Sequence, residues 1–285
     1  MAEKIVEYST HPTDHPEIEA EQALHRLQLV NNWPIHPGTR VLEIGCGQGN
    51  CTAVLAYTIG TTGHVDAIDP APGDYGQPFT LDQAQAHLSA SEIGQQITWH
   101  RAEPEQFISS SSNTTWDVAV LAHCIWYFES TKVLRNILAA LRGKVKSVCV
   151  AEYALSATEP DAVPHLLAAI ARGSLEAYKH ESEENIRSLL GPEAIEAAAR
   201  REGWVVKNSR VLVPGAGLGD GGWETAAVIG EAFLGDIESL GISEAAKVVL
   251  RSTREATLRA AKRVKAAGEV RTMDVWVAEL VGIGN

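Results

Sequence analysis

The segment VLEIGCGQG contains the residues best suited to bind a small ligand. Gly45, Gly47 and Gly49 form a G-x-G-x-G motif at the end of an apolar, strand-like run. Because glycine lacks a Cβ and tolerates positive φ, this motif lets the backbone turn sharply and approach a ligand closely. Glu43 lies inside the run, just before the turn. A second apolar run ends at Asp69, where a carboxylate would hold the hydroxyls of a ribose.

The form of the motif argues against a pyrophosphate ligand. Dinucleotide-binding turns read G-x-G-x-x-G and place the pyrophosphate at a helix N-terminus. Here Glu43 precedes the triplet, and its carboxylate would repel a pyrophosphate but suit a ligand with positive charge. The segment resembles motif I of the class I S-adenosylmethionine-dependent methyltransferases. The resemblance implies S-adenosylmethionine as the cofactor and S-adenosylhomocysteine as its product.

The composition favours a soluble cytoplasmic enzyme. The chain has 285 residues, which is long for one domain and short for two, and 45% of them are hydrophobic. A net charge of −12 argues against a nucleic-acid partner. The polar N-terminus argues against a signal peptide, and the lack of a long apolar stretch argues against a membrane partner. The oligomeric state stays open.

No metal site is expected. The four cysteines form no C-x-x-C pair, which argues against a zinc site or a disulfide framework and fits reduced thiols in a cytosol. Asp117 stands alone near the position where metal-assisted catechol enzymes cluster their acids. We therefore expect a reaction without a metal ion.

Strand-like and helix-like segments alternate through the first part of the chain. This alternation predicts an α/β fold with a parallel sheet and right-handed crossovers. Its ligand belongs at the carboxyl ends of the strands, where the glycine turn, Asp69, Glu103 and His123 would meet. Helices are expected over about 17–32, 50–59, 81–91 and 130–142, and strands within 41–44, 64–69, 96–104, 116–128 and 146–155.

The second half is larger than a minimal nucleotide-binding domain requires. Two further strand-like runs lie within 202–214 and 270–282. The family resemblance implies a Rossmann-like sheet of seven strands with the seventh antiparallel. We expect one methyltransferase domain over 1–285, with a cofactor-binding core at 38–155. Two helical insertions, 156–200 and 215–270, are expected to cap the edge of the sheet.

The resemblance also assigns cofactor contacts, residue by residue. Gly45, Cys46 and Gly47 would pass close to the methionine part, with Glu43 beneath it, and Asp69 would bind the ribose. Pro70 and the loop after it depart from the common pattern and put the adenine contacts on that side in doubt. Two further positions match the border of the adenine, and one matches the place beside the sulfonium and its methyl group. These are Ala102, Glu103 and His123.

Methyl transfer needs mainly positioning and exclusion of water, because a sulfonium is already a good leaving group. A partly ionised thiol needs no base, whereas a hydroxyl usually does. His123, Tyr127 and Glu152 are the candidate bases, since each lies near a strand's carboxyl end. His123 is preferred because its ordinary pKa lies near working pH, although it could equally be a hydrogen-bonded pocket histidine.

The acceptor is expected to be a small organic molecule. The segment AHCIWYF lacks the N-P-P-Y or D-P-P-Y motif of enzymes that methylate nucleic-acid bases. Aromatic residues could line an apolar pocket, and the glycine-rich stretch 215–222 is typical of a lid hinge. The chain is similar to fungal natural-product methyltransferases of the gliotoxin type, which implies a thiol acceptor. Oxygen or nitrogen methylation, or a non-catalytic cofactor-binding protein, remain alternatives. The candidate pocket residues are Trp126, Tyr127, Phe128 and Trp223.

Overall fold

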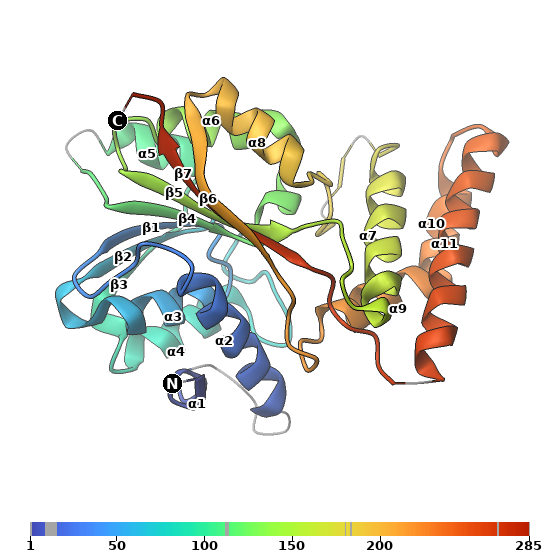
Figure 1. The fold of residues 1–285 in the computed structure, drawn as a ribbon, viewed down its shortest axis with the longest axis horizontal. Coiled ribbons are helices and arrows are strands. Elements are labelled where there is room, and N and C mark those ends of the chain that lie inside the picture. Colours follow the sequence, from blue (N-terminus) through green and yellow to red (C-terminus); the bar gives the residue numbers. More distant parts are fainter. Residues whose placement is uncertain are drawn as a thin grey trace.

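A computed structural model describes residues 2–8, 16–111, 114–179, 181–182, 184–266 and 268–284. Within these residues, seven strands form one sheet in the order β3-β2-β1-β4-β5-β7-β6 (Figure 1). The strands are β1 (Arg40–Ile44), β2 (His64–Ile68), β3 (Ile97–His100), β4 (Val118–Ala122), β5 (Ser147–Tyr153), β6 (Trp204–Leu212) and β7 (Val275–Gly282).

The first five strands run parallel, and β7 pairs antiparallel with both β5 and β6. The predicted seven-stranded Rossmann-like sheet with an antiparallel seventh strand is therefore confirmed. Because the parallel strands share a direction, the turns after β1, β2, β4 and β5 meet at one edge of the sheet. We call this the carboxyl edge.

Alternating apolar side chains bury the sheet on both faces. Val41 packs into one apolar cluster and Leu42 into the other, as expected when successive strand residues point to opposite faces. Helices cover each face (Figure 1). One face is covered by α1 (Ala2–Val6), α2 (Pro16–Val30), α3 (Asn50–Ile59) and α4 (Leu81–Ala90), and the other by α5 (Pro104–Ser110), α6 (Thr131–Ala140) and α8 (Pro192–Arg201). Short 3₁₀ helices are η1 (Gly60–Thr62), η2 (Gly94–Gln96), η3 (Ile125–Tyr127) and η4 (Pro160–Ala162).

Four more helices stand beside the sheet as a separate layer, at the right of Figure 1. They share an apolar cluster of their own, built around Phe233, Ile237 and Leu250. We call this group the helical bundle. It consists of α7 (Val163–Glu176), α9 (Asp220–Ile229), α10 (Glu231–Ser239) and α11 (Glu244–Lys265).

The two segments expected to form the cap divide differently in the structure. From 156–200, only α7 joins the helical bundle, whereas α8 packs on the sheet beside β6 and α6. The reason is the apolar stripe of α8, in which Ile195, Ala198 and Ala199 are buried in the second face's cluster. From 215–270, three helices α9, α10 and α11 all belong to the bundle.

One buried acid fastens the base of the bundle to the sheet. Asp274, just before β7, is 2% exposed. Its carboxylate accepts hydrogen bonds from the Ser156 hydroxyl at 2.7 Å, and from the Thr158 amide and hydroxyl at 3.0 Å. The segment that leaves β5 and the segment that enters β7 are therefore held together where the bundle begins.

Candidate active site

The glycine turn adopts left-handed backbone at all three glycines. Gly45, Gly47 and Gly49 have φ of 73°, 52° and 95°. A Cβ on Gly45 would lie 2.5 Å from the Cys124 Cβ, and one on Gly49 would lie 2.6 Å from the Leu88 Cδ1. At Gly47 nothing lies within 4 Å of that position. The turn is therefore packed tightly at both ends and open in its middle, as a backbone that receives a ligand requires.

Asp69 joins the glycine turn to the end of β2. Its Oδ2 accepts the Gly47 amide at 2.8 Å, and its Oδ1 accepts the Ala71 amide at 2.9 Å. Each carboxylate oxygen has a second lone pair, so both can still accept a ribose hydroxyl. Asp69 thus holds the turn in shape and presents acceptor oxygens beside its open middle.

Glu43 lies beneath the turn and is 2% exposed. Its Oε2 accepts the Thr52 hydroxyl at 2.5 Å. Burial is the main cause that raises the pKa of this carboxyl to about 7, so it is poised between neutral and charged near neutral pH. The charge of Arg26, on α2, acts in the opposite direction.

The residues expected at the adenine border separate. Ala102 is half-buried and packs against the second face's apolar cluster, whereas Glu103 is exposed at the start of α5. Arg101 instead reaches back to the unusual loop after β2. Its guanidinium donates to the Ala71 carbonyl at 2.8 Å and pairs with the Asp82 carboxylate at 2.7 Å.

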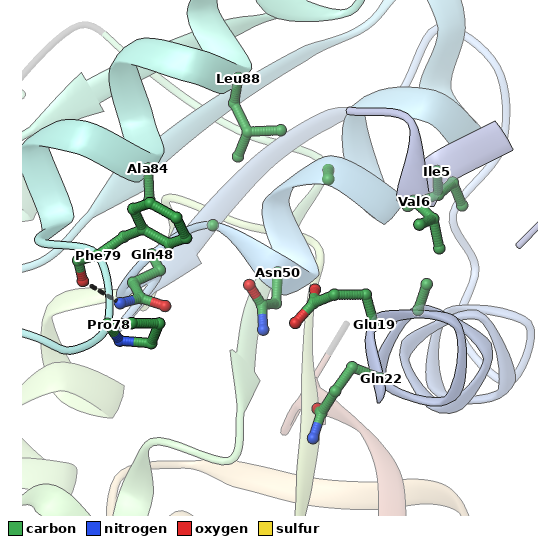
Figure 2. A pocket seen from close by; sticks show the side chains of 13 residues that line it. Ile5, Val6, Glu19, Gln22, Gln48, Asn50, Pro78, Phe79, Ala84 and Leu88 are labelled. Atoms are coloured by element: carbon green, nitrogen blue, oxygen red, sulfur yellow. Dashed lines mark hydrogen bonds between the residues drawn. The ribbon is translucent and has the colours of Figure 1, made fainter. Parts of the chain in front are cut away.

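A pocket of about 600 Å³, counting its open mouth, lies on the outer side of the glycine turn (Figure 2). Gln48 and Asn50 enter it from the turn, and Gln22 and Glu19 from α2. The Gln48 side chain also donates to the Phe79 carbonyl of the loop after β2. The apolar part of the wall is formed by Ile5, Val6, Ala23, Ala53, Pro78, Phe79, Ala84 and Leu88.

His123 follows β4 with a left-handed φ of 54°. Its amide donates to the Ala151 carbonyl of β5 at 2.8 Å, which fixes it at the carboxyl edge. Its Nε2 lies 2.9 Å from the Nε2 of His25, a buried residue of α2. Its Nδ1 lies 3.6 Å from the Glu152 Oε1, and its ring packs 4.7 Å from that of Tyr153.

Glu152 is held by backbone amides. Its Oε2 accepts the amides of Ile125 at 3.0 Å and Trp126 at 3.4 Å, and its Oε1 accepts the Tyr153 amide at 3.0 Å. The side chain is 1% exposed, so this carboxylate shapes the turn after β4. Tyr127 differs, since its ring is 44% exposed while packing around its hydroxyl raises its pKa.

The four aromatic candidates fall into two pairs. Trp126 is buried, and its Nε1 donates to the Leu190 carbonyl at 3.0 Å. Phe128 packs against the second face's apolar cluster. Trp223, on α9, and Tyr127 keep large exposed surfaces of 53% and 44%. The second pair is therefore free to contact a ligand, whereas the first pair serves the interior.

Sequence reasoning missed the polar residues that face this edge from helices. His25 and Arg26 come from α2, His165 from α7, and Asp220 and Glu224 from α9. His25 and His165 are 2% and 0% exposed. The sequence signal for such a residue is a polar side chain on the apolar face of a helix. Only the tertiary fold shows which groups that side chain contacts.

Within the described residues, no group of three or more His, Cys, Asp or Glu side chains is arranged to hold a metal ion. All four cysteines are free and buried, and burial raises the pKa of each thiol. A search of the described helices found none with the length and apolar character needed to cross a membrane.

Comparisons with known proteins agree with this geometry. A family model described as a methyltransferase domain matches residues 41–144. The methyltransferases phomM and phomM' of Diaporthe leptostromiformis are 30% and 32% identical, over 88% of this chain and 75% of each relative. A solved cyclopropane-fatty-acyl-phospholipid synthase-like protein from Lactobacillus casei ATCC 334 is 30% identical, with a TM-score of 0.84 over 98% of both chains. With its glycine turn, its seven-stranded sheet and these relatives, the chain belongs to the class I S-adenosylmethionine-dependent methyltransferases, and S-adenosylmethionine is its cofactor.

Proposed function

We propose that this enzyme methylates a small organic acceptor, a natural-product thiol in the first instance, at the junction of the carboxyl edge and the helical bundle. Two exposed aromatic side chains support this position: Tyr127 follows β4 at the carboxyl edge, and Trp223 belongs to α9 of the bundle. A hinged helical cover can shield a small acceptor from water. The bound cofactor supplies a methyl group on a positively charged sulfur.

The glycine turn and its acids are proposed to bind that cofactor. Gly47 leaves room beside the backbone, and Asp69 presents acceptor oxygens for the ribose. Glu43 lies beneath the turn, where a negative charge would attract the ammonium or sulfonium. The residue set therefore fits a cationic nucleoside, which is the same conclusion that the motif favoured. Cys46 stays in this assignment as a buried member of the turn.

One observation carries the choice of nucleophile. The three candidate bases are engaged or unsuited: the Nε2 of His123 contacts His25, Glu152 accepts backbone amides, and Tyr127 has a raised pKa. An acceptor that arrives with a free lone pair would react without a base, and a thiolate does so near neutral pH. A neutral amine does so as well, which makes nitrogen methylation the second candidate. A hydroxyl acceptor is disfavoured.

A matched set of acceptors tests this proposal. Phenethyl mercaptan, phenethylamine and phenethyl alcohol differ only in the nucleophilic atom, and mass spectrometry detects a methylated product of each. We expect turnover of the thiol and none of the alcohol, and turnover of the amine in place of the thiol would instead support nitrogen methylation. Methylation of the alcohol alone would contradict the absence of a base.

Substitution of His123 adds a second test. Asn tolerates the left-handed backbone at this position, so His123→Asn should keep the turn after β4. With a thiol acceptor the loss in kcat should be modest near pH 8. A loss of about 10²–10⁴-fold that persists at high pH would instead identify His123 as a general base. The exposed His36→Asn serves as the control.

A further inference from the structure

Polar groups that lack partners gather where α7 and α9 of the helical bundle meet the carboxyl edge. Buried polar atoms in folded proteins nearly always make a hydrogen bond. Here the His165 Nε2, the Glu224 Oε2 and the Nδ1 atoms of His25 and His123 are buried without one. The three histidines come from α2, the turn after β4 and α7, and they are connected because His123 contacts His25 while Tyr153 packs against both His123 and His165.

His165 shows what kind of group is missing. The side chain is fully buried, and its Nδ1 accepts the Met273 amide at 3.0 Å. The ring proton must therefore be on Nε2, which is left as an N–H donor without an acceptor. The ring packs edge-on against Tyr153 at 5.0 Å, and its charged neighbours are Asp220 and His123. A ligand with a hydroxyl or carbonyl oxygen would satisfy this donor.

Two carboxylates of α9 lie on the same side of the helix, one turn apart. Asp220 accepts only a long hydrogen bond, 3.4 Å, from the Gln22 side chain, and it makes no ion pair with any described residue. Glu224 lies 3.4 Å from Arg172, but that guanidinium also binds Glu184 more closely. The negative charge here is therefore only partly compensated.

Aromatic rings complete the surroundings of these acids. Burial is the main cause that raises the pKa of Tyr127 and of Tyr153, and the charges of Asp220 and Glu224 act on both rings in the same direction. Aromatic faces attract organic cations, and a carboxylate beside them adds to that attraction. The helix N-terminus stabilises Asp220 without a ligand, but it does not explain Glu224, the rings or the unpaired His165.

We propose that Asp220 and Glu224 of α9 select acceptors that carry an organic ammonium group, and that the His165 Nε2–H binds an oxygen of the same molecule. This inference rests on the proposed methylation of a small acceptor and names its chemical class. The anchored ammonium is protonated and is not the nucleophile. A thiol or a second, neutral amine of the acceptor would take the methyl group, and the proton released from it would pass to solvent.

Three small probes dissect the site in protein saturated with S-adenosylhomocysteine. Phenylalaninol carries an ammonium and a hydroxyl, hydrocinnamyl alcohol lacks the ammonium, and phenethylamine lacks the hydroxymethyl group. Isothermal titration near pH 7 gives their affinities. Phenylalaninol should bind about tenfold more tightly than hydrocinnamyl alcohol, and more tightly than phenethylamine, in keeping with hydrogen bonds to charged groups.

Variants of α9 locate the selectivity. Asp220→Asn with Glu224→Gln should reduce the preference for phenylalaninol over hydrocinnamyl alcohol to less than about threefold. Asp236→Asn, an exposed position of the neighbouring α10, should leave it unchanged. A merely structural role of the two acids would weaken both probes together.

Three results would overturn the inference. They are equal binding of phenylalaninol and hydrocinnamyl alcohol by the unaltered enzyme, an undiminished preference in the double variant, or no binding of any probe. Failure to bind S-adenosylhomocysteine would be a different outcome, because it would contradict the proposed cofactor residues and not the choice of acceptor.

Discussion

At the scale of single residues, Asp69 connects the shape of the glycine turn to cofactor binding. In the Asp69→Asn variant one side-chain oxygen can still accept a hydrogen bond. The negatively charged carboxylate to which the Gly47 and Ala71 amides donate is lost. Hydrogen bonds to charged groups contribute about 1.5–3 kcal/mol each, so S-adenosylhomocysteine should bind at least ~10-fold more weakly by calorimetry. Asp74→Asn, an exposed acid in the following loop, is the control. If both variants bind S-adenosylhomocysteine with equal affinity, Asp69 does not contribute to cofactor binding.

The glycines of the turn allow a matched comparison. Gly45 and Gly143 have almost the same left-handed φ, 73° and 74°, but only the first is crowded, by Cys124. Gly143→Ala should lower the free energy of unfolding by about 1–2 kcal/mol, the cost of a left-handed non-glycine residue. Gly45→Ala should lose a further ~1–3 kcal/mol from overpacking. Chemical denaturation measures the free energy of unfolding of both variants. Equal decreases would show that the glycine turn shifts enough to accommodate the added methyl group.

At the scale of elements, Trp223 of α9 tests the cover over the acceptor. Its ring packs over Gly219, and the residue is 53% exposed. Trp223→Ala should raise the acceptor's KM or lower kcat, while cofactor affinity stays within about threefold, since the ring lies on the bundle and not on the glycine turn. Val249→Ala, at a position of α11 that is 60% exposed, provides the comparison. Unchanged acceptor kinetics would argue that α9 is no lid.

The elements of the sheet were predictable because each has a strong local signal. Apolar strands alternate with helices, and Gly45 and Asp69 mark the ends of the first two strands. This alternation predicts a doubly wound sheet without any knowledge of the ligand. The helix over 50–59 begins and ends as expected. By contrast, α8 has the same local pattern as α7, and only the space left beside β6 decides that Ile195 packs on the sheet. Helical periodicity alone does not choose between two apolar surfaces.

The candidate site was predictable only where its residues come from strand ends. Asp69 and His123 follow strands, so topology brings them to one edge. His25 and His165 come from helices whose position relative to that edge depends on packing, so a polar side chain on an apolar helix face does not reveal that they reach it. The same reason hid Asp220 and Glu224 on α9, which reads as an ordinary acidic helix start.

At the scale of the whole molecule, buried histidines couple stability to pH. Burial lowers the pKa of His165 from 6.5 to about 4. Between those values the unfolded chain binds a proton that the folded protein does not, so the free energy of unfolding falls as the pH is lowered. At about 1.4 kcal/mol per pKa unit this amounts to roughly 3 kcal/mol. The pKa of His25 is lowered as well, and adds to the slope in the same direction.

His165→Asn tests this coupling. The Asn oxygen can still accept the Met273 amide, but the side chain no longer titrates. Its unfolding free energy, from urea titrations, should fall less steeply between pH 6.5 and 4 than that of the unaltered enzyme. Glu43 acts in the opposite sense, because its raised pKa favours the folded state as pH drops below 7. Parallel curves for the two proteins would assign the acid slope to other groups.

The hydrogen bonds of the buried Asp274 have a consequence for how the enzyme could acquire a new acceptor specificity. Because Asp274 joins the segment that leads from β5 into α7 to the segment that leads from α11 into β7, two of the connections between the bundle and the sheet lie side by side. The bundle also has its own apolar interior, centred on Phe233 and Leu250. The helices of a homologue could thus replace those of the bundle while these two connections keep their place. Evolution, or an engineer, could then retarget the methyl group while the glycine turn and its acids stay untouched.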